Sequence, residues 1–229
     1  MHVHVPKPLH GWREFFGEVG IIVVGVLIAI GAEQLVEMHH WHDAVAEQRR
    51  ALHEEIRNNL STAKARVLLA PCFERRLADM GAIFARHKAG GALMLSGPVG
   101  VPAVAETSTG AWDGAIGSQV LEHFPLKERL ALAESFDAYK SMSADLRTEA
   151  RLWDQMSLLD HPEYLTEGDW VELRQTYARL RGADARNGFF AQWVLDHNQE
   201  GETPYPIALE DMFVKATTKA FCSTAPLLR

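Results

Sequence analysis

The sequence predicts an all-α protein in which one N-terminal transmembrane helix continues into an irregular extracytoplasmic helical bundle. Three observations predict this fold class. A strongly apolar segment occupies residues 15–36, and residues 37–69 contain neither Gly nor Pro and are rich in good helix formers. No segment shows the strict alternation of apolar and polar residues that is typical of a β-strand.

The apolar segment, FFGEVGIIVVGVLIAIGAEQLV, is long enough to cross a bilayer. Fourteen residues from Val19 to Ala32 carry no charge, and about 20 helical residues span the ~30 Å hydrocarbon core. The segment fits a span if Glu18 and Glu33 lie at the two interfaces. The alternative is a buried core helix, but a soluble helix normally carries a polar stripe.

A cleaved signal peptide is another alternative for the same segment. Glu14 and Glu18 lie where a signal peptide is normally basic, and the apolar run continues into a long polar helix without a break. These features favour an uncleaved anchor.

The distribution of basic residues predicts the orientation. Lys7 and Arg13 precede the segment, whereas the first basic residue after it is Arg49. Because Lys and Arg concentrate on the cytoplasmic side, we expect residues 1–14 to form a short cytoplasmic tail. Residues 37–229 then form a periplasmic domain of a bacterial inner-membrane protein.

One face of the predicted span has the spacing of a helix-packing seam. Its members recur at alternating steps of four and three residues: Glu18, Ile22, Gly25, Ala29, Ala32 and Val36. Gly25 and Ala29 form a small-xxx-small pair that allows another helix to approach closely. The carboxylate of Glu18 reaches the cytoplasmic headgroups, bonds a partner helix or carries a proton, and these alternatives stay open. The seam predicts docking to other integral membrane subunits or self-association, besides contact with lipid.

The anchor GEVGIIVVGVLIAIGAEQ, from Gly17 to Gln34, resembles the N-terminal anchor of an uncharacterised family of short proteobacterial single-pass membrane proteins. The preceding PKPLHGWRE, residues 6–14, fits the same family. The anchor is also similar to that of a bacteroidete family of unknown function with a Gly-Glu…Gly-x-Leu-Ile-Ala pattern. The resemblance covers about residues 6–37; it implies an uncleaved anchor and brings no catalytic residue.

The pattern of the chain predicts six or seven helices packed as an irregular bundle. Pro71 is expected to kink or end the helix that leaves the span, and a second helix is expected from about Cys72 to His87. Residues 88–108, rich in Gly and Pro, predict a loose connection. Further helices are expected after a Thr107-Ser108-Thr109 cap to about residue 121, over 125–159, over 166–180 from a Thr166–Asp169 capping box, and over 186–197 and 207–221.

The two cysteines, Cys72 and Cys222, are expected to form a disulfide if the domain is periplasmic. The bond would tie the C-terminal helix to the second helix. By the chain-entropy estimate it would contribute about 4 to 5 kcal/mol, and less in practice. The alternative is two buried free thiols, so this prediction depends on the topology.

The densest polar cluster follows the span. His39, His42 and Asp43 share one helix face and form a legitimate transition-metal set. The alternatives are ordinary headgroup-boundary residues, which we prefer, and a pH sensor. His2 and His4 form a weaker set in the N-terminal tail.

Other functions find little support in the sequence. Nothing matches a phosphate-binding loop, a dinucleotide fingerprint, a nucleophile elbow or a zinc-protease motif, so we expect no enzyme and no cofactor. The net charge of −7 without a basic block argues against nucleic-acid binding. Four tryptophans are expected to fill the core or grooves: Trp112, Trp153, Trp170 and Trp193.

Together these patterns predict a non-catalytic structural or accessory subunit of a larger membrane complex. It would dock its partner through the transmembrane helix and the periplasmic helical domain. The alternative is a periplasmic ligand-binding sensor module, which requires a cavity of several hundred Å³ with aromatic walls and converging polar groups.

Overall fold

The computed structural model describes residues 11–103 and 106–197, and near the C-terminus residues 214–215, 217, 221–222 and 226–228. Four α-helices organise these residues: α1 (Trp12–Lys88), α2 (Gly110–Ile116), α3 (Leu126–Met156) and α4 (Glu167–His197). Three short 3-10 helices connect them: η1 (Gln119–His123), η2 (Ser157–Asp160) and η3 (Pro162–Tyr164). Within the described residues the only β-type pairing is an isolated bridge between Leu95 and Leu228. The all-α prediction is confirmed, while the helix expected at 207–221 lies largely outside the described residues.

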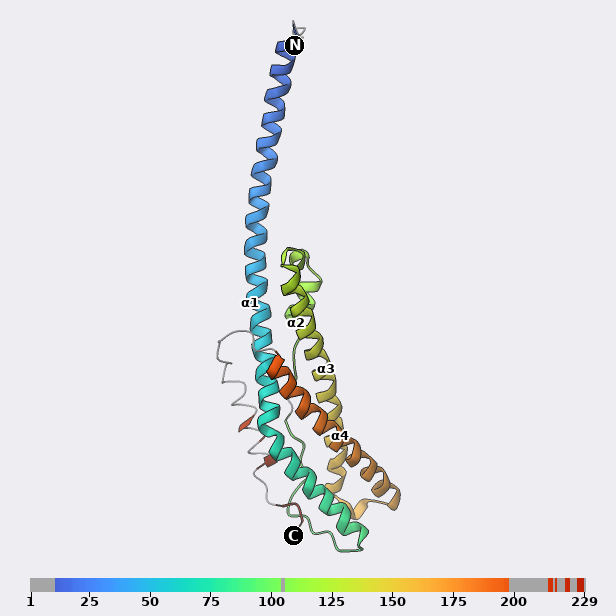
Figure 1. Cartoon of the computed structure of the whole chain (residues 1–229). Coiled ribbons are helices and arrows are strands. Elements are labelled where there is room, and N and C mark those ends of the chain that lie inside the picture. The colour runs from blue at the N-terminus through green and yellow to red at the C-terminus, as the bar shows by residue number, and fades with distance from the viewer. Residues whose placement is uncertain are drawn as a thin grey trace, which may run out of the picture.

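α1 is a single helix of 77 residues whose N-terminal part projects alone beyond the domain (Figure 1). Pro71 lies inside it. The expectation that a separate helix begins at Cys72 is therefore wrong. Proline removes one backbone N–H and favours a bend, and α1 curves in its C-terminal part without ending (Figure 1). Leu69 and Phe73, on either side of the proline, are buried in the core, and this packing keeps the helix continuous.

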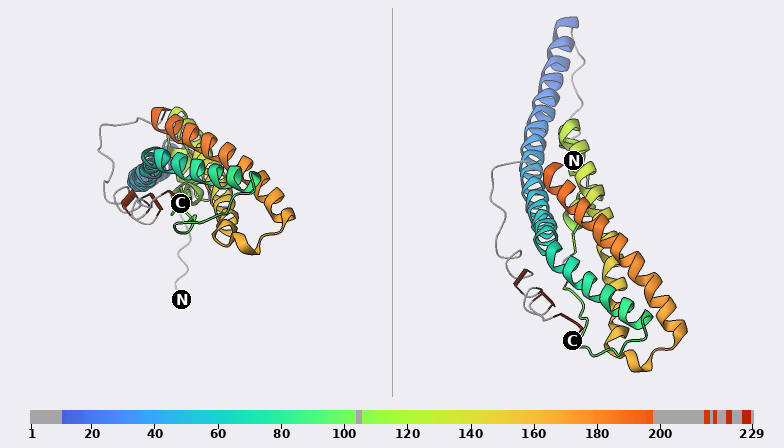
Figure 2. Two further views of the ribbon diagram at one scale, coloured as in Figure 1. Left: turned by 90° about the horizontal axis from the view of Figure 1, so that it is seen from below. Right: turned by 60° about the horizontal axis from the view of Figure 1, so that its bottom comes forward.

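α4 runs antiparallel to the C-terminal half of α1 and packs against both α1 and α3 (Figure 2). The Tyr177 hydroxyl donates a hydrogen bond of 2.9 Å to the carbonyl of Leu77. Further along, the ring of Trp170 stacks on His87 with centroids 3.9 Å apart. Later residues of α1 thus meet earlier residues of α4, as an antiparallel pair requires.

The start of α4 confirms the predicted capping box, but its length differs from the expectation. The Asp169 carboxylate accepts the backbone N–H of Thr166 at 2.7 Å, and the Thr166 hydroxyl accepts the N–H of Asp169 at 3.3 Å. The helix then continues to His197. The break expected between 180 and 186 is wrong, because buried residues on both sides, Leu180 and Asn187, hold one helix against the core.

The cap of α2 also differs from the expectation. Thr109 is the N-cap residue but makes no side-chain bond to the helix backbone. Instead the Glu55 carboxylate, from α1, accepts the N–H groups of Ala111 and Trp112 at 3.0 and 3.2 Å. A carboxylate at a helix N-terminus accepts hydrogen bonds from backbone N–H groups that have no partner within the helix. Its negative charge is also attracted by the positive end of the helix dipole. α2 ends at Ile116, with η1 after it, where one helix to residue 121 was expected.

The start of α3 differs by one residue from the expectation. Pro125 is the N-cap residue rather than the first helical residue, and η2 extends the helical path to Asp160.

Three of the four tryptophans expected in the core or in grooves are buried: Trp112, Trp153 and Trp170. Trp193 is half-buried.

The interior consists of two hydrophobic clusters. The cluster nearer the projecting end of α1 includes Leu52, Phe136 and Val194. The cluster at the distal end includes Phe73 and Trp153. Each cluster draws side chains from α1, α3 and α4, so all three long helices contribute to both.

A layer of buried charges lies between these clusters. The Arg66 guanidinium donates to Glu149 at 3.0 Å and to the Asp184 carboxylate at 2.6 Å. Glu149 also accepts the side-chain amide of Asn187 at 2.5 Å, and the Phe73 ring lies 4.5 Å from the Arg66 guanidinium carbon. Burial is the largest influence on Asp184 and raises the pKa of its carboxyl above the ordinary value. The layer joins α1, α3 and α4 through side chains on all three.

We predict that Arg66→Met destabilises the protein strongly. It would leave the buried carboxylate of Glu149 and the partly buried carboxylate of Asp184 without their cation, which costs about 3–5 kcal/mol in comparable buried pairs. Asp184→Asn should cost less, because burial already favours the uncharged form of this side chain. Urea unfolding of the detergent-solubilised protein measures both. The exposed Arg179→Met is the control, and equal midpoints for R66M and R179M would contradict the prediction.

Candidate functional site

The N-terminal third of α1 is apolar and exposed. An 18-residue window in it has a mean hydropathy of 2.4, and none of that window is buried. Large apolar side chains such as Ile21, Leu27 and Ile28 are more than 60 % exposed. Among the described residues this is the one helix long and apolar enough to cross a membrane. The core-helix alternative is wrong for this structure, since nothing in the described chain covers the segment.

The described part of the chain covers none of the seam. All six seam residues are exposed along the projecting helix: Glu18, Ile22, Gly25, Ala29, Ala32 and Val36. A Cβ placed on Gly25 would meet no atom within 4 Å, and the same holds for Gly20. Glycine inside a helix costs about 0.5–1 kcal/mol relative to alanine. The described fold therefore offers no packing reason for these glycines.

The junction between the exposed segment and the domain is an aromatic contact. Trp41, on α1, stacks on His123, in η1, with ring centroids 4.0 Å apart and planes at 19°. The Trp41 indole N–H also donates to the Glu37 carboxylate at 3.3 Å. An open groove of about 630 Å³ lies here, and its walls include Met38, Trp41, Val45 and His123. The domain thus begins to contact α1 five residues after Val36.

An ion pair fixes the domain to α1 just below this junction. Arg49 binds Glu128, near the start of α3, through two hydrogen bonds of 2.7 and 2.9 Å. The bond to Glu128 raises the pKa of Arg49 above its ordinary value. The Arg49 guanidinium also lies 5.2 Å from the centre of the Phe124 ring. Two parallel N–H···O bonds fix orientation as well as distance, so this pair sets where α3 begins relative to α1.

The candidate metal set does not form a closed site. Asp43 lies 3.7 Å from the nearest His39 nitrogen and 3.5 Å from that of His42, and all three side chains are largely exposed. The part of the chain that the structure describes contains no group of three or more His, Cys, Asp or Glu side chains arranged to hold a metal ion. His2 and His4 lie outside the described residues.

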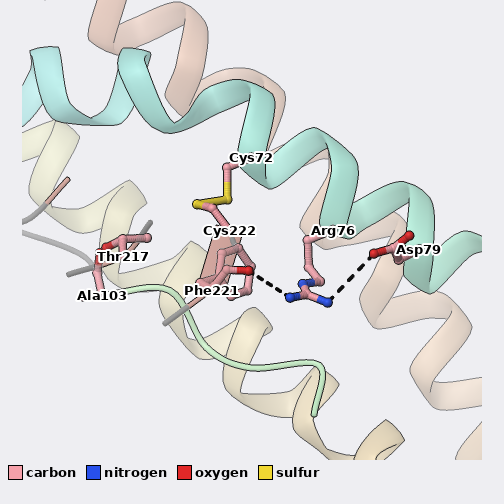
Figure 3. The surroundings of a disulfide bond; sticks show 7 residues. All are labelled: Cys72, Arg76, Asp79, Ala103, Thr217, Phe221 and Cys222. Carbon is pink, nitrogen blue, oxygen red and sulfur yellow. Dashed lines mark hydrogen bonds and ion pairs between the residues drawn. A yellow bond between two sulfur atoms is a disulfide. The ribbon is translucent and has the colours of Figure 1, made fainter. Parts of the chain in front are cut away.

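The far end of the domain carries the disulfide between Cys72 and Cys222 (Figure 3). Beside it, Arg76 donates a hydrogen bond of 2.8 Å to the carbonyl of Phe221 and lies 3.8 Å from Asp79 (Figure 3). Burial lowers the pKa of Arg76 below its ordinary value. The Phe221 ring packs edge-on against Trp153 at 5.1 Å. The bond therefore holds residues 221–222 against α1 at the position predicted for a cystine.

We predict that removing this disulfide destabilises the protein without changing its fold. Cys72→Ser with Cys222→Ser should lower the free energy of unfolding by about 2–4 kcal/mol, because the unfolded chain regains the freedom of a long loop. Thermal unfolding in detergent measures the loss. A reductant should reproduce the loss in the parent protein and have no effect on the double variant; equal stability of parent and variant would contradict the prediction.

A second groove, of about 480 Å³, lies between α1, α3 and the end of α4. Ile56, Leu132 and Trp193 form apolar walls, and His53 and His197 are among its polar lining residues. The rings of Trp193 and His197 stack at 4.4 Å. Its volume is within the range of small-molecule sites, but half of its twelve lining residues are polar or charged, which is more than is usual for such sites.

Comparison with known proteins gives no relative: no family model, curated protein or solved structure matches the chain. The functional argument therefore depends on the geometry of this chain. Sequence reasoning missed the Arg66 layer and the Trp41–His123 junction. Arg66 lies 83 and 118 positions from Glu149 and Asp184, and Trp41 lies 82 positions from His123. Only the His-Trp cluster at residues 39–42 indicated that the region after the apolar segment was unusual.

Proposed function

We propose that this chain is a single-pass bacterial inner-membrane protein that acts as a non-catalytic structural or accessory subunit of a larger membrane complex. Residues 15–36 cross the bilayer, the N-terminus is cytoplasmic and the helical domain is periplasmic. The observation that carries the proposal is the fully exposed apolar part of α1. Residues 15–36 carry 15 apolar side chains. Leaving them in water would be very unfavourable, at roughly 25 cal/mol per Å² of apolar surface, whereas lipid removes that cost.

Two features support a docking role for the span. Gly25 has no neighbour in the described chain that would require a glycine, and the two alanines of the seam, Ala29 and Ala32, are exposed. Helix association in lipid depends on close backbone approach, which small residues permit. A second helix, from another integral subunit or from a second copy, would use the seam in this way.

The disulfide supports the periplasmic placement of the domain. Cystines persist in oxidising compartments such as the periplasm and are rare in the cytoplasm. The chain has two cysteines, and the structure joins them. The basic residues before the span, Lys7 and Arg13, favour the same orientation.

We predict that Gly25→Leu weakens recovery of the partner, because a bulky side chain on the seam separates the two helix backbones. The protein would be purified from native membranes in mild detergent and the proteins that accompany it quantified by mass spectrometry. Gly20→Leu, on the opposite face of the same helix, is the matched control. Equal recovery with both variants would remove the docking argument.

We predict that an alkaline phosphatase domain fused after residue 229 is active and that the mature chain keeps its N-terminus. This reporter folds only outside the cytoplasm, so activity reports the side of the membrane reached by the C-terminus. The intact mass of the membrane-extracted protein tests retention of the anchor. An inactive fusion would reverse the orientation, and a mass lacking the apolar segment would make it a signal peptide.

A periplasmic ligand-binding sensor is the second candidate function. The groove between α1, α3 and α4 favours it, since Trp193 offers a flat apolar wall beside the imidazoles of His53 and His197. The purification from native membranes separates the two candidates. A small molecule that accompanies the chain in stoichiometric amount, without a protein partner, would favour the sensor.

A further inference from the structure

The outer side of α4 carries a strip of small and apolar side chains that the described chain leaves uncovered. α4 lies at the surface of the domain, and its buried residues, such as Leu180 and Asn187, face α1 and α3 (Figure 2). On the opposite face six residues recur at alternating steps of four and three. All six are exposed except Gly182, which is half-buried. We call them the α4 strip: Val171, Gln175, Ala178, Gly182, Ala185 and Phe189.

The shape of the α4 strip suits another helix. Its large apolar side chains lie near its two ends, Val171 at 47 % exposure and Phe189 at 73 %, about 27 Å apart along the helix. Between them the side chains are small, and a Cβ on Gly182 would meet only the end of the Arg186 side chain, at 3.5 Å. The described fold therefore gives no packing reason for this glycine, which is unfavourable inside a helix. Distances between packed helices, about 8–10 Å, are shortest where the contacting side chains are small.

Arginines border the α4 strip on both sides. Successive residues of a helix are rotated by about 100°, which places Arg174 and Arg181 on one flank and Arg179 and Arg186 on the other. The guanidinium of Arg181 lies 6.0 Å from the centre of the Tyr177 ring. Within the described residues none of the four arginines forms an ion pair. Their charges are thus available to a partner.

This face is basic although the whole chain is acidic. Between residues 173 and 195 the one acidic residue is Asp184, and its carboxylate binds Arg66 inside the domain. Two acidic residues of the neighbouring helices border the stretch: Glu74 of α1, near Asp184, and Asp145 of α3, whose carbonyl accepts a hydrogen bond from α4. Four arginines against these two carboxylates leave an excess of two positive charges, whereas the net charge of the chain is −7. Complementary charge selects an acidic partner for such a surface.

We propose that the α4 strip docks an acidic amphipathic helix of a partner subunit. The apolar side of that helix lies on the strip, and Asp or Glu residues at its edges bind the arginines on the two flanks. This is a common mode of helix recognition, and arginine binds carboxylates through paired hydrogen bonds. The proposal rests on the accessory-subunit role proposed above and names the surface of the domain that serves it. A second copy of this chain does not fit, because pairing two α4 strips in either direction brings the arginines of both copies together.

A photo-reactive side chain on the α4 strip tests the proposal. In the full chain, in its native membranes, p-benzoylphenylalanine replaces Phe189, which it resembles in shape. The matched control has the same replacement at Tyr164, an aromatic residue of η3 that is 79 % exposed. After irradiation, mass spectrometry identifies the cross-linked peptides. We expect position 189, and not position 164, to capture a peptide of another protein in which acidic residues exceed basic ones and apolar residues recur at helical spacing.

Charge reversal tests the role of the arginines. Arg179→Glu with Arg186→Glu should lower the cross-link yield at position 189 at least about tenfold, because like charges across an interface strongly oppose association. Lys127→Glu with Arg151→Glu makes the same change of charge at two exposed residues of α3 and should leave the yield unchanged. Equal circular dichroism spectra of the two double variants show that the fold is kept.

A change of shape without a change of charge tests the strip itself. Gly182→Leu should also lower the yield, because a bulky side chain in the middle of the strip separates the two helices. An anionic polymer held by the arginines alone would be insensitive to this substitution, and that result would overturn the proposal.

Other results would overturn it as well: equal cross-linking at positions 189 and 164, a cross-link to a second copy of this chain, a captured peptide without an excess of acidic residues, or a yield that survives charge reversal. The proteins that accompany the chain in mild detergent separate this proposal from the accessory role. A chain that recovers a membrane subunit but gives no cross-link at position 189 refutes the α4 surface alone. One that recovers no protein and gives no cross-link refutes the accessory role as well.

Discussion

The buried ion layer of Arg66, Glu149 and Asp184 is the constraint on which the arrangement of this protein depends. Hydrophobic clusters above and below it would tolerate small shifts of one helix along another, since apolar contacts have no direction. The ion pairs of the layer do not tolerate such shifts. Any movement that separates the charges leaves each of them unpaired in a medium of low dielectric constant. Sliding α3 by one turn along α1 would displace Glu149 by about 5.4 Å from Arg66. The layer therefore selects one register for the three long helices.

Because α1 is continuous, this register also determines where the domain lies relative to the apolar segment. The same helix carries Arg66 in the core, Arg49 at the start of α3, Trp41 at the junction and Val36 at the end of the apolar segment. No loop or glycine hinge interrupts it between Val36 and Arg66. A flexible linker would let the domain move freely over the bilayer. Here the position of the domain relative to the apolar segment is determined by residues about 30 positions further along the chain.

Local patterns in the sequence predicted the local features of this fold. The helical class and the Thr166–Asp169 capping box follow from residue type and spacing, because each involves neighbours in the chain. The Cys72–Cys222 pair involves the only two cysteines of the sequence, and its prediction also required the expected periplasmic topology. Predictions failed where packing outweighed local preference. The separate helix expected from Cys72 does not form, since buried neighbours on both sides of Pro71 keep α1 continuous, and Glu55 caps α2 from another helix in place of the adjacent threonines. The Arg66 layer could not be predicted, because its members look like ordinary surface charges until three helices bring them together.

The residues of α1 change character along its length in the way that its surroundings require. Residues 15–36 are apolar apart from Glu18, Glu33 and Gln34, a composition that would suit a medium without polar partners. Residues 37–44 are mostly polar, and all but Trp41 and Ala44 are exposed. After the Trp41–His123 contact with η1, from Val45 onward, apolar and polar residues separate into an inner and an outer face, and α1 packs against α2 and α3. The first third of this 77-residue helix makes no tertiary contact within the described chain, and the proposed membrane anchoring accounts for it, because lipid would surround the apolar side chains that the fold leaves exposed.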